Sequence, residues 1–105
     1  MALRLRVCRV DEVPPGARRA VVVPGMAWPV LVVNLDGELV VSAGVCPHED
    51  VDLTGGSIDD GVITCPGHSY EFDLRTGRCT HDARLILPRY RVSIIGDEIW
   101  IDAVG

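Results

Sequence analysis

Short apolar runs, many of them rich in valine or alternating with polar residues, recur along the chain. Runs of this kind are typical of β-strands, because successive side chains of a strand point to opposite faces of the sheet. Strands are therefore predicted at residues 3–9, 19–23, 30–34, 38–42, 62–64, 89–95 and 98–102.

The residues between these runs predict how the strands are joined. Asp36-Gly37 separates the third and fourth runs, and Gly96-Asp97 separates the last two. Both dipeptides favour tight hairpins. No stretch has a sustained helical period, and residues 10–19 have room for one short helical turn at most. We therefore predict an all-β fold, an antiparallel sandwich or barrel.

One segment differs from this β scaffold. Residues of about 44–83 are rich in Gly, Asp and Thr, and their apolar runs are very short. This segment is predicted to be a loop-rich insertion. The 105 residues are enough for one modest core, so residues 1–105 are expected to form a single domain.

The negative charge of the chain is concentrated in the insertion. From Cys46 to Asp82 there are eight acidic and two basic residues, a balance of −6, while the whole chain has a net charge of −5. All ten cationic residues are arginines. An acidic chain is a poor partner for nucleic acid and for an anionic membrane surface, so neither partner is expected.

A targeting signal is also not expected. Arg18-Arg19 precedes an apolar run that is superficially similar to a twin-arginine export signal, but Pro24, Gly25 and Pro29 interrupt it. No small-residue cleavage site follows. No segment reaches the roughly 18 uninterrupted apolar residues typical of a membrane span. The chain is therefore expected to be cytoplasmic, with no membrane segment.

Two turns combine a cysteine with a histidine. They are Cys46-Pro47-His48 and, sixteen residues further on, Cys65-Pro66-Gly67-His68. Proline and glycine favour tight turns here, so that thiol and imidazole can face one point. The chain has only four cysteines and three histidines. Chance is therefore a poor explanation for two such turns, and they predict a metal centre.

The donor types limit the choice of metal. Thiolate together with imidazole suits zinc or an iron–sulfur cluster. Structural zinc sites typically space cysteine with cysteine and histidine with histidine. Mixed turns fit better a two-metal centre in which each loop gives sulfur to one iron and nitrogen to the other. A [2Fe–2S] cluster with two histidines on one iron has this arrangement. A Cys₂His₂ zinc module that serves binding or structure remains the alternative.

A longer motif resembles the Rieske ferredoxins. It reads Cys46-Pro47-His48-x4-Leu53-x2-Gly56, then Cys65-Pro66-x-His68, then Phe72-Asp73-x2-Thr76-Gly77. The resemblance implies one [2Fe–2S] cluster, with Cys46 and Cys65 on the inner iron and His48 and His68 on the outer iron. It also implies that Leu53 and the glycines after it let the backbone approach the cluster and point amides at sulfur.

The neighbouring residues depart from the high-potential members of that family. Val51 and Gly67 stand in the regions where those relatives have two further cysteines, so no disulfide between the cluster loops is expected. Tyr70 and Phe72 stand where those relatives place hydroxyl donors to sulfur. Fewer donors imply a potential in the lower part of the span of about −150 to +300 mV. A midpoint above about +100 mV would contradict this expectation.

A third Cys-x-His pair, Cys79-Thr80-His81, has no second mixed turn to complete a site and is interpreted as structural. Family members often have a proline in this stretch, whereas this chain has His81-Asp82-Ala83. The sequence therefore does not predict how this side of the cluster loops is packed.

The resemblance implies a one-electron carrier and not an enzyme. The electrons would come from a flavin-dependent NAD(P)H reductase and go to a terminal oxygenase of the toluene-monooxygenase type or of the ring-hydroxylating dioxygenase type. A Rieske-fold subunit that senses redox state is a further alternative. The acidic insertion suggests docking to basic patches on the partners.

Overall fold

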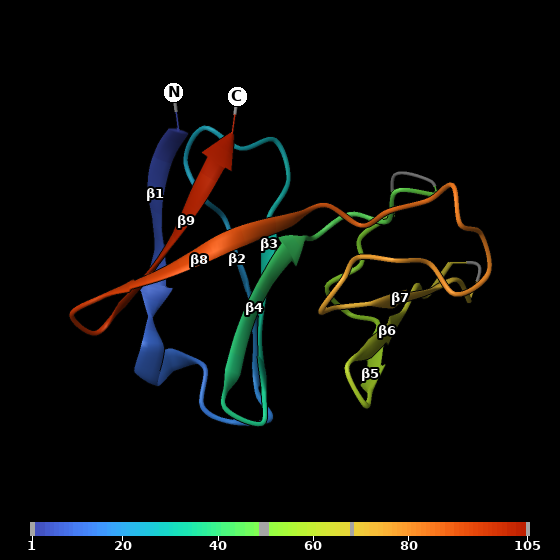
Figure 1. Ribbon diagram of the computed structural model, residues 1–105, viewed down its shortest axis with the longest axis horizontal. Coiled ribbons are helices and arrows are strands. Elements are labelled where there is room, and N and C mark those ends of the chain that lie inside the picture. Colours follow the sequence, from blue (N-terminus) through green and yellow to red (C-terminus); the bar gives the residue numbers. More distant parts are fainter. Residues whose placement is uncertain (1, 49–50, 68, 105) are drawn as a thin grey trace.

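The computed structural model describes residues 2–48, 51–67 and 69–104 of the chain. Its regular elements are β-strands apart from one short 3-10 helix, which confirms the all-β prediction (Figure 1). The strands are β1 Ala2–Arg9, β2 Arg18–Val21, β3 Val30–Leu35, β4 Glu38–Ala43, β5 Ser57–Asp59, β6 Val62–Thr64, β7 Glu71–Asp73, β8 Arg89–Ile95 and β9 Glu98–Val104.

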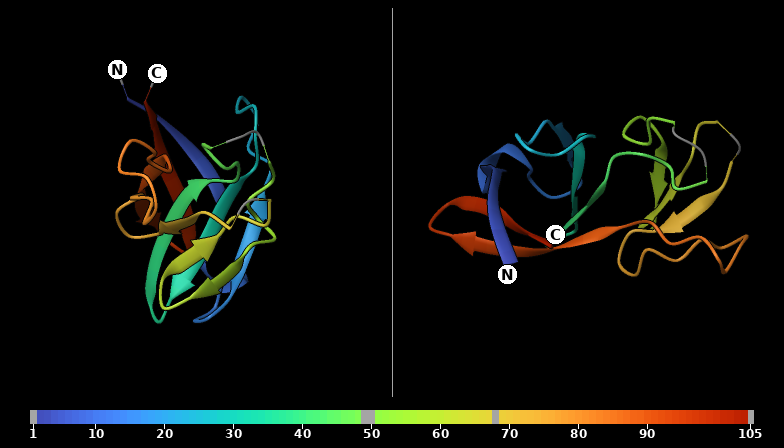
Figure 2. Two further views of the ribbon diagram at one scale, coloured as in Figure 1. Left: turned by 90° about the vertical axis from the view of Figure 1, so that its right-hand side faces the viewer. Right: turned by 90° about the horizontal axis from the view of Figure 1, so that it is seen from above.

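The strands form two antiparallel sheets. A six-stranded sheet has the order β1-β9-β8-β4-β3-β2, and a three-stranded sheet has the order β5-β6-β7. Figure 1 shows the curled larger sheet on the left and the smaller sheet on the right. The chain enters the small sheet after β4 and leaves it before β8, as Figure 2 also shows. The predicted insertion thus contains the small sheet.

Strand β3, next to the edge strand β2 of the large sheet, separates two apolar cores. Its run Val30–Val33 is almost completely buried, so both faces of the strand are covered. Val30 and Val32 pack into a core inside the curled sheet, with side chains from β1, β4 and β9. Leu31 and Val33 pack into a second core with side chains of the insertion. A continuous apolar run is typical of a strand that is buried on both faces.

The predicted strands agree with the structure to within a few residues. β6 and β8 have the predicted bounds, while β2 occupies residues 18–21 instead of 19–23. The sequence prediction missed β5 and β7, which have three residues each with a single apolar residue, whereas the equally short β6 was predicted because it is a run of β-branched residues. The turn between β5 and β6, Asp60-Gly61, has positive φ angles of 51° and 78°. Asp36-Gly37, which was predicted as a hairpin turn, has 54° and 102°.

The short 3-10 helix Val10–Glu12 lies in the segment where one helical turn was predicted. The backbone N–H of Arg9 donates to Glu12 Oε2 at 2.8 Å, which closes the turn. In the described ranges of the chain, no helix is both long enough and apolar enough to cross a membrane.

Candidate metal centre

The first Cys/His turn lies directly after β4. The backbone N–H of Cys46 donates to the carbonyl oxygen of Val51 at 2.9 Å, and that of Leu53 donates to Gly44 at 2.9 Å. These bonds close the loop at its base. Cys46 is fully buried and His48 is half-buried. The loop therefore directs its cysteine inward and holds its histidine nearer to solvent.

The second Cys/His turn lies between β6 and β7. The backbone N–H of Cys65 donates to the Tyr70 carbonyl oxygen at 2.7 Å, and that of Ser69 donates back to Cys65 at 3.0 Å. Ser69 has a φ of 60°, a conformation that few residues other than glycine adopt. The turn is therefore as tight as Pro66-Gly67 predicted. Cys65 is buried, and His68 lies outside the described residues.

The fold brings these two loops together. Cys46 and Cys65 belong to one buried cluster of side chains. The ring of His48, from the first loop, lies 4.1 Å from the ring of Tyr70, which ends the second loop, at an interplanar angle of 51°. Three of the four predicted ligands, Cys46, His48 and Cys65, are thus found in one region that combines two segments distant in sequence.

The depth of the donors fits a Rieske cluster. The two cysteines are 0% and 1% exposed, and a buried thiolate requires a nearby positive charge, which iron would supply. His48 is less buried, as a ligand of an outer iron would be. Within the described residues, no three His, Cys, Asp or Glu side chains converge on one ion position. A Rieske cluster takes two cysteines on one iron and two histidines on the other, so each of these loops would give one ligand to each iron.

The third Cys-x-His pair is divided between core and surface. Cys79 is buried in the same core as the cluster loops, and its backbone pairs with that of Phe72. His81 is exposed and lies against the ring of Tyr70, with a centroid distance of 6.0 Å. The stretch without the family's proline therefore packs on the second cluster loop through an aromatic ring.

Two carboxylates beside the loops are held by local hydrogen bonds. The hydroxyl and the backbone N–H of Thr54 donate to Asp52 at 2.6 and 2.9 Å and lower the pKa of that carboxyl. The guanidinium and the backbone N–H of Arg84 donate to Asp82 and lower the pKa of its carboxyl. Both carboxylates therefore stay charged to lower pH than usual.

One expectation about the first loop is wrong. The amides of Leu53 and of the Gly55-Gly56 pair were expected to point toward sulfur, and this is wrong for Leu53 and Gly56. Instead, the N–H of Leu53 bonds to the Gly44 carbonyl oxygen and that of Gly56 bonds to the Leu53 carbonyl oxygen, at 2.9 and 3.0 Å. The contact between Tyr70 and His48 was not expected, because it depends on the packing of two loops and has no local sequence signal.

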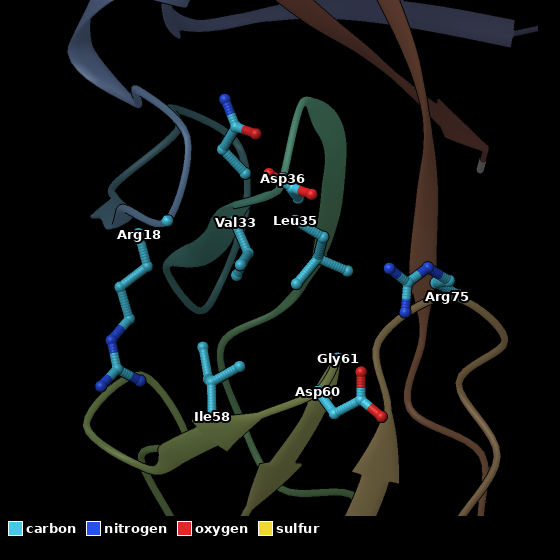
Figure 3. Close-up of a pocket in the computed structure, with 10 residues that line it drawn as sticks. Arg18, Val33, Leu35, Asp36, Ile58, Asp60, Gly61 and Arg75 are labelled. Atoms are coloured by element: carbon cyan, nitrogen blue, oxygen red, sulfur yellow. The ribbon is translucent and has the colours of Figure 1, made fainter.

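A cleft of about 360 Å³ lies between the two sheets. Figure 3 shows the side chains of Val33, Leu35 and Ile58 between two flanking arginines, Arg18 and Arg75. None of the described predicted ligands lines this cleft. It is a boundary between the two sheets and not part of the candidate metal centre.

The two arginines connect the sheets across this boundary. Arg18, on β2 of the large sheet, donates to the carbonyl oxygen of Gly56 in the insertion. Arg75, in the insertion after β7, donates through Nε to Glu38 Oε1 on β4 at 3.1 Å. Each arginine therefore bonds to the opposite sheet.

Removal of one of these connections should lower the stability of the chain measurably. Arg18→Ala is expected to lower the free energy of unfolding by about 1 kcal/mol, the usual contribution of a hydrogen bond of this kind. Denaturant unfolding of the purified protein measures the change. Arg19→Ala is the matched control, because the partner of Arg19 among the described residues is the exposed Glu12, at 3.9 Å. Equal losses in the two variants would contradict the assignment.

Comparison with known proteins agrees with this site. The model of the Rieske [2Fe–2S] domain family matches residues 4–90. The biphenyl dioxygenase ferredoxin subunit of Pseudomonas sp. (strain KKS102) is 34% identical over 99 residues, 92% of this chain and 89% of that protein. The ferredoxin component of the alkene monooxygenase system of Xanthobacter autotrophicus is 29% identical over 90% of this chain and 77% of that protein.

Solved structures give the same result. A ferredoxin of Sphingomonas yanoikuyae B1 superimposes with a TM-score of 0.85 at 33% identity and covers 97% of this chain and 100% of its own. A chain of the complex of reduced oxygenase and oxidized ferredoxin in carbazole 1,9a-dioxygenase has a TM-score of 0.82 at 25% identity, with 97% of both chains covered.

The fold, the paired loops and these matches define the class: the chain belongs to the Rieske [2Fe–2S] domain family. Within that class, the relatives that match this chain over most of their own length are named as ferredoxin components of oxygenase systems. The prediction of a Rieske-type electron carrier is thereby confirmed.

Proposed function

We propose that this chain holds one [2Fe–2S] cluster through Cys46, His48, Cys65 and His68, and that it passes single electrons from a flavin-dependent NAD(P)H reductase to a terminal oxygenase in the cytoplasm. The observation that supports this most directly is the meeting of the two mixed loops, with both cysteines in one core and His48 against the second loop. The chemistry supplied by such a cluster is reversible one-electron transfer.

The four side chains have separate tasks in this proposal. Cys46 and Cys65 hold the inner iron where water is excluded, since both are buried. His48 and His68 hold the outer iron. His48 is half-buried, so the histidine side of the centre is nearer to solvent and to a docked partner than the cysteine side. Residues 1–105 would form a single Rieske domain around this centre.

The partners follow from the relatives and from the charge. The named relatives serve a biphenyl dioxygenase and an alkene monooxygenase system. We infer a terminal oxygenase of one of these two kinds as the electron acceptor of this chain. The net charge of −6 between Cys46 and Asp82 favours a basic docking patch on that partner. The rate of electron transfer should then fall as salt screens the charges.

Iron analysis and EPR spectroscopy test the proposal. Protein purified without oxygen is expected to contain about two irons and two acid-labile sulfides per chain. Reduction with dithionite should give the EPR signal of one unpaired electron per cluster. A colourless protein with one zinc per chain would overturn the proposal, because zinc has no accessible redox change.

A further inference from the structure

Three aromatic rings from three segments lie close together beside the candidate metal centre. The ring of His48, in the first loop, lies 4.1 Å from that of Tyr70, in the second. The ring of Tyr70 also lies 6.0 Å from that of His81, at an interplanar angle of 28°. His48 and Tyr70 are half-buried and His81 is exposed, so Tyr70 meets both a predicted ligand and an exposed side chain.

The exposed ring of these three has its own support. His81 Nε2 lies 3.6 Å from Glu71 Oε1, and the hydroxyl of Thr80 donates to the same oxygen at 3.2 Å. The backbone N–H of Thr80 also donates to the Glu71 carbonyl oxygen at 2.9 Å. Since Glu71 directly follows Tyr70 in the chain, these bonds tie the third segment to the end of the second loop beside the Tyr70 ring.

We propose that Tyr70 is a positioning residue that fixes the imidazole of His48, and that His81 supports Tyr70 from the solvent side. The inference rests on the proposed function, because it takes His48 as a ligand of the outer iron. A metal-bound imidazole must keep one ring orientation, and neighbouring side chains commonly set it. Tilted aromatic pairs at this distance are favourable beyond their buried area.

The geometry also explains the residues at two positions where the chain departs from its relatives. Tyr70 is too long to act as the small hydroxyl donor of the high-potential proteins, and its ring is instead in contact with a ligand. His81 stands in the stretch where family members often have proline, and its ring lies beside that of Tyr70. The two residues at these positions therefore meet each other beside the first loop.

Variants of the cluster-loaded protein test this role. The measured quantity is the rate at which the visible absorbance of the cluster is lost to an excess of the iron chelator EDTA. Tyr70→Leu should accelerate this loss about fivefold, in keeping with the loss of an aromatic pair. Tyr70→Phe keeps the ring and should stay within about twofold of the parent. His81→Ala should fall between the two.

Tyr90→Leu is the matched control. Tyr90 is the only other tyrosine of the chain; it is half-buried on β8 and packs in the core of the large sheet. This variant should lose its cluster at the parent rate. The EPR spectrum of the reduced protein is the second measurement: its g values should shift in Tyr70→Leu and stay unchanged in Tyr70→Phe and Tyr90→Leu.

The outcomes separate the inference from the function on which it rests. Parent-like cluster loss and g values in Tyr70→Leu would overturn the positioning role, and so would equal acceleration in Tyr90→Leu. A parent-like rate in His81→Ala would overturn the supporting role of His81. If the parent protein itself contains no iron and sulfide, the proposed function fails before the inference is tested.

Discussion

Cys65→Ala should leave the chain without its cluster: iron and labile sulfide are expected to fall from about two of each per chain to almost none. The inner iron would keep a single protein ligand, and the buried pocket around it offers no water-exposed substitute, because Cys46 and Cys65 are 0% and 1% exposed. Metal analysis and the visible absorbance of the purified variant measure the result.

The chain contains a close control for this substitution. Cys79 likewise stands shortly before a histidine, His81, and it is buried in the same core as Cys65. Cys79→Ala removes a thiol of similar burial but should keep both irons and both sulfides. The proposed ligand set would be wrong if Cys79→Ala lost the cluster and Cys65→Ala retained it.

Gly56→Ala should have the largest effect on stability among the substitutions considered. A Cβ atom at this position would lie 2.2 Å from the carbonyl oxygen of Thr64 and 3.2 Å from Ile63 Cγ1. Both belong to β6, whose last residue directly precedes Cys65. Backbone cannot move aside as a flexible side chain can, so the free energy of unfolding should fall by about 3 kcal/mol. Thermal unfolding should show a melting temperature lower by about 15 °C.

Gly55→Ala provides the neighbouring comparison. No atom lies within 4 Å of a Cβ built at Gly55. The free energy of unfolding of Gly55→Ala should therefore stay within about 0.5 kcal/mol of that of the parent protein. Equal destabilisation by the two substitutions would show that the loop needs glycine flexibility and that the contact with Thr64 is not the cause.

The sequence predicted the strands of the large sheet better than those of the small sheet. The longer strands and the Asp36-Gly37 hairpin were predicted because alternation and turn chemistry are properties of adjacent residues. β5 and β7 were missed, although the Asp60-Gly61 turn has the same composition as the predicted hairpin and similar φ angles. Each of these two strands has one apolar residue between polar neighbours and is stabilised by pairing in the sheet, whereas β6, equally short, has a run of β-branched residues that its sequence shows.

The amino-acid sequence by itself determined the all-β class, the two tight turns that hold Cys46, His48 and Cys65, and the acidic character of the insertion. Each of these depends on residue type and on spacing over a few positions. Only the tertiary structure decided that β3 divides two cores and that the ring of Tyr70 meets those of both His48 and His81. Such contacts join segments that are separate in the chain, and packing alone brings them together, so no local pattern could have predicted them.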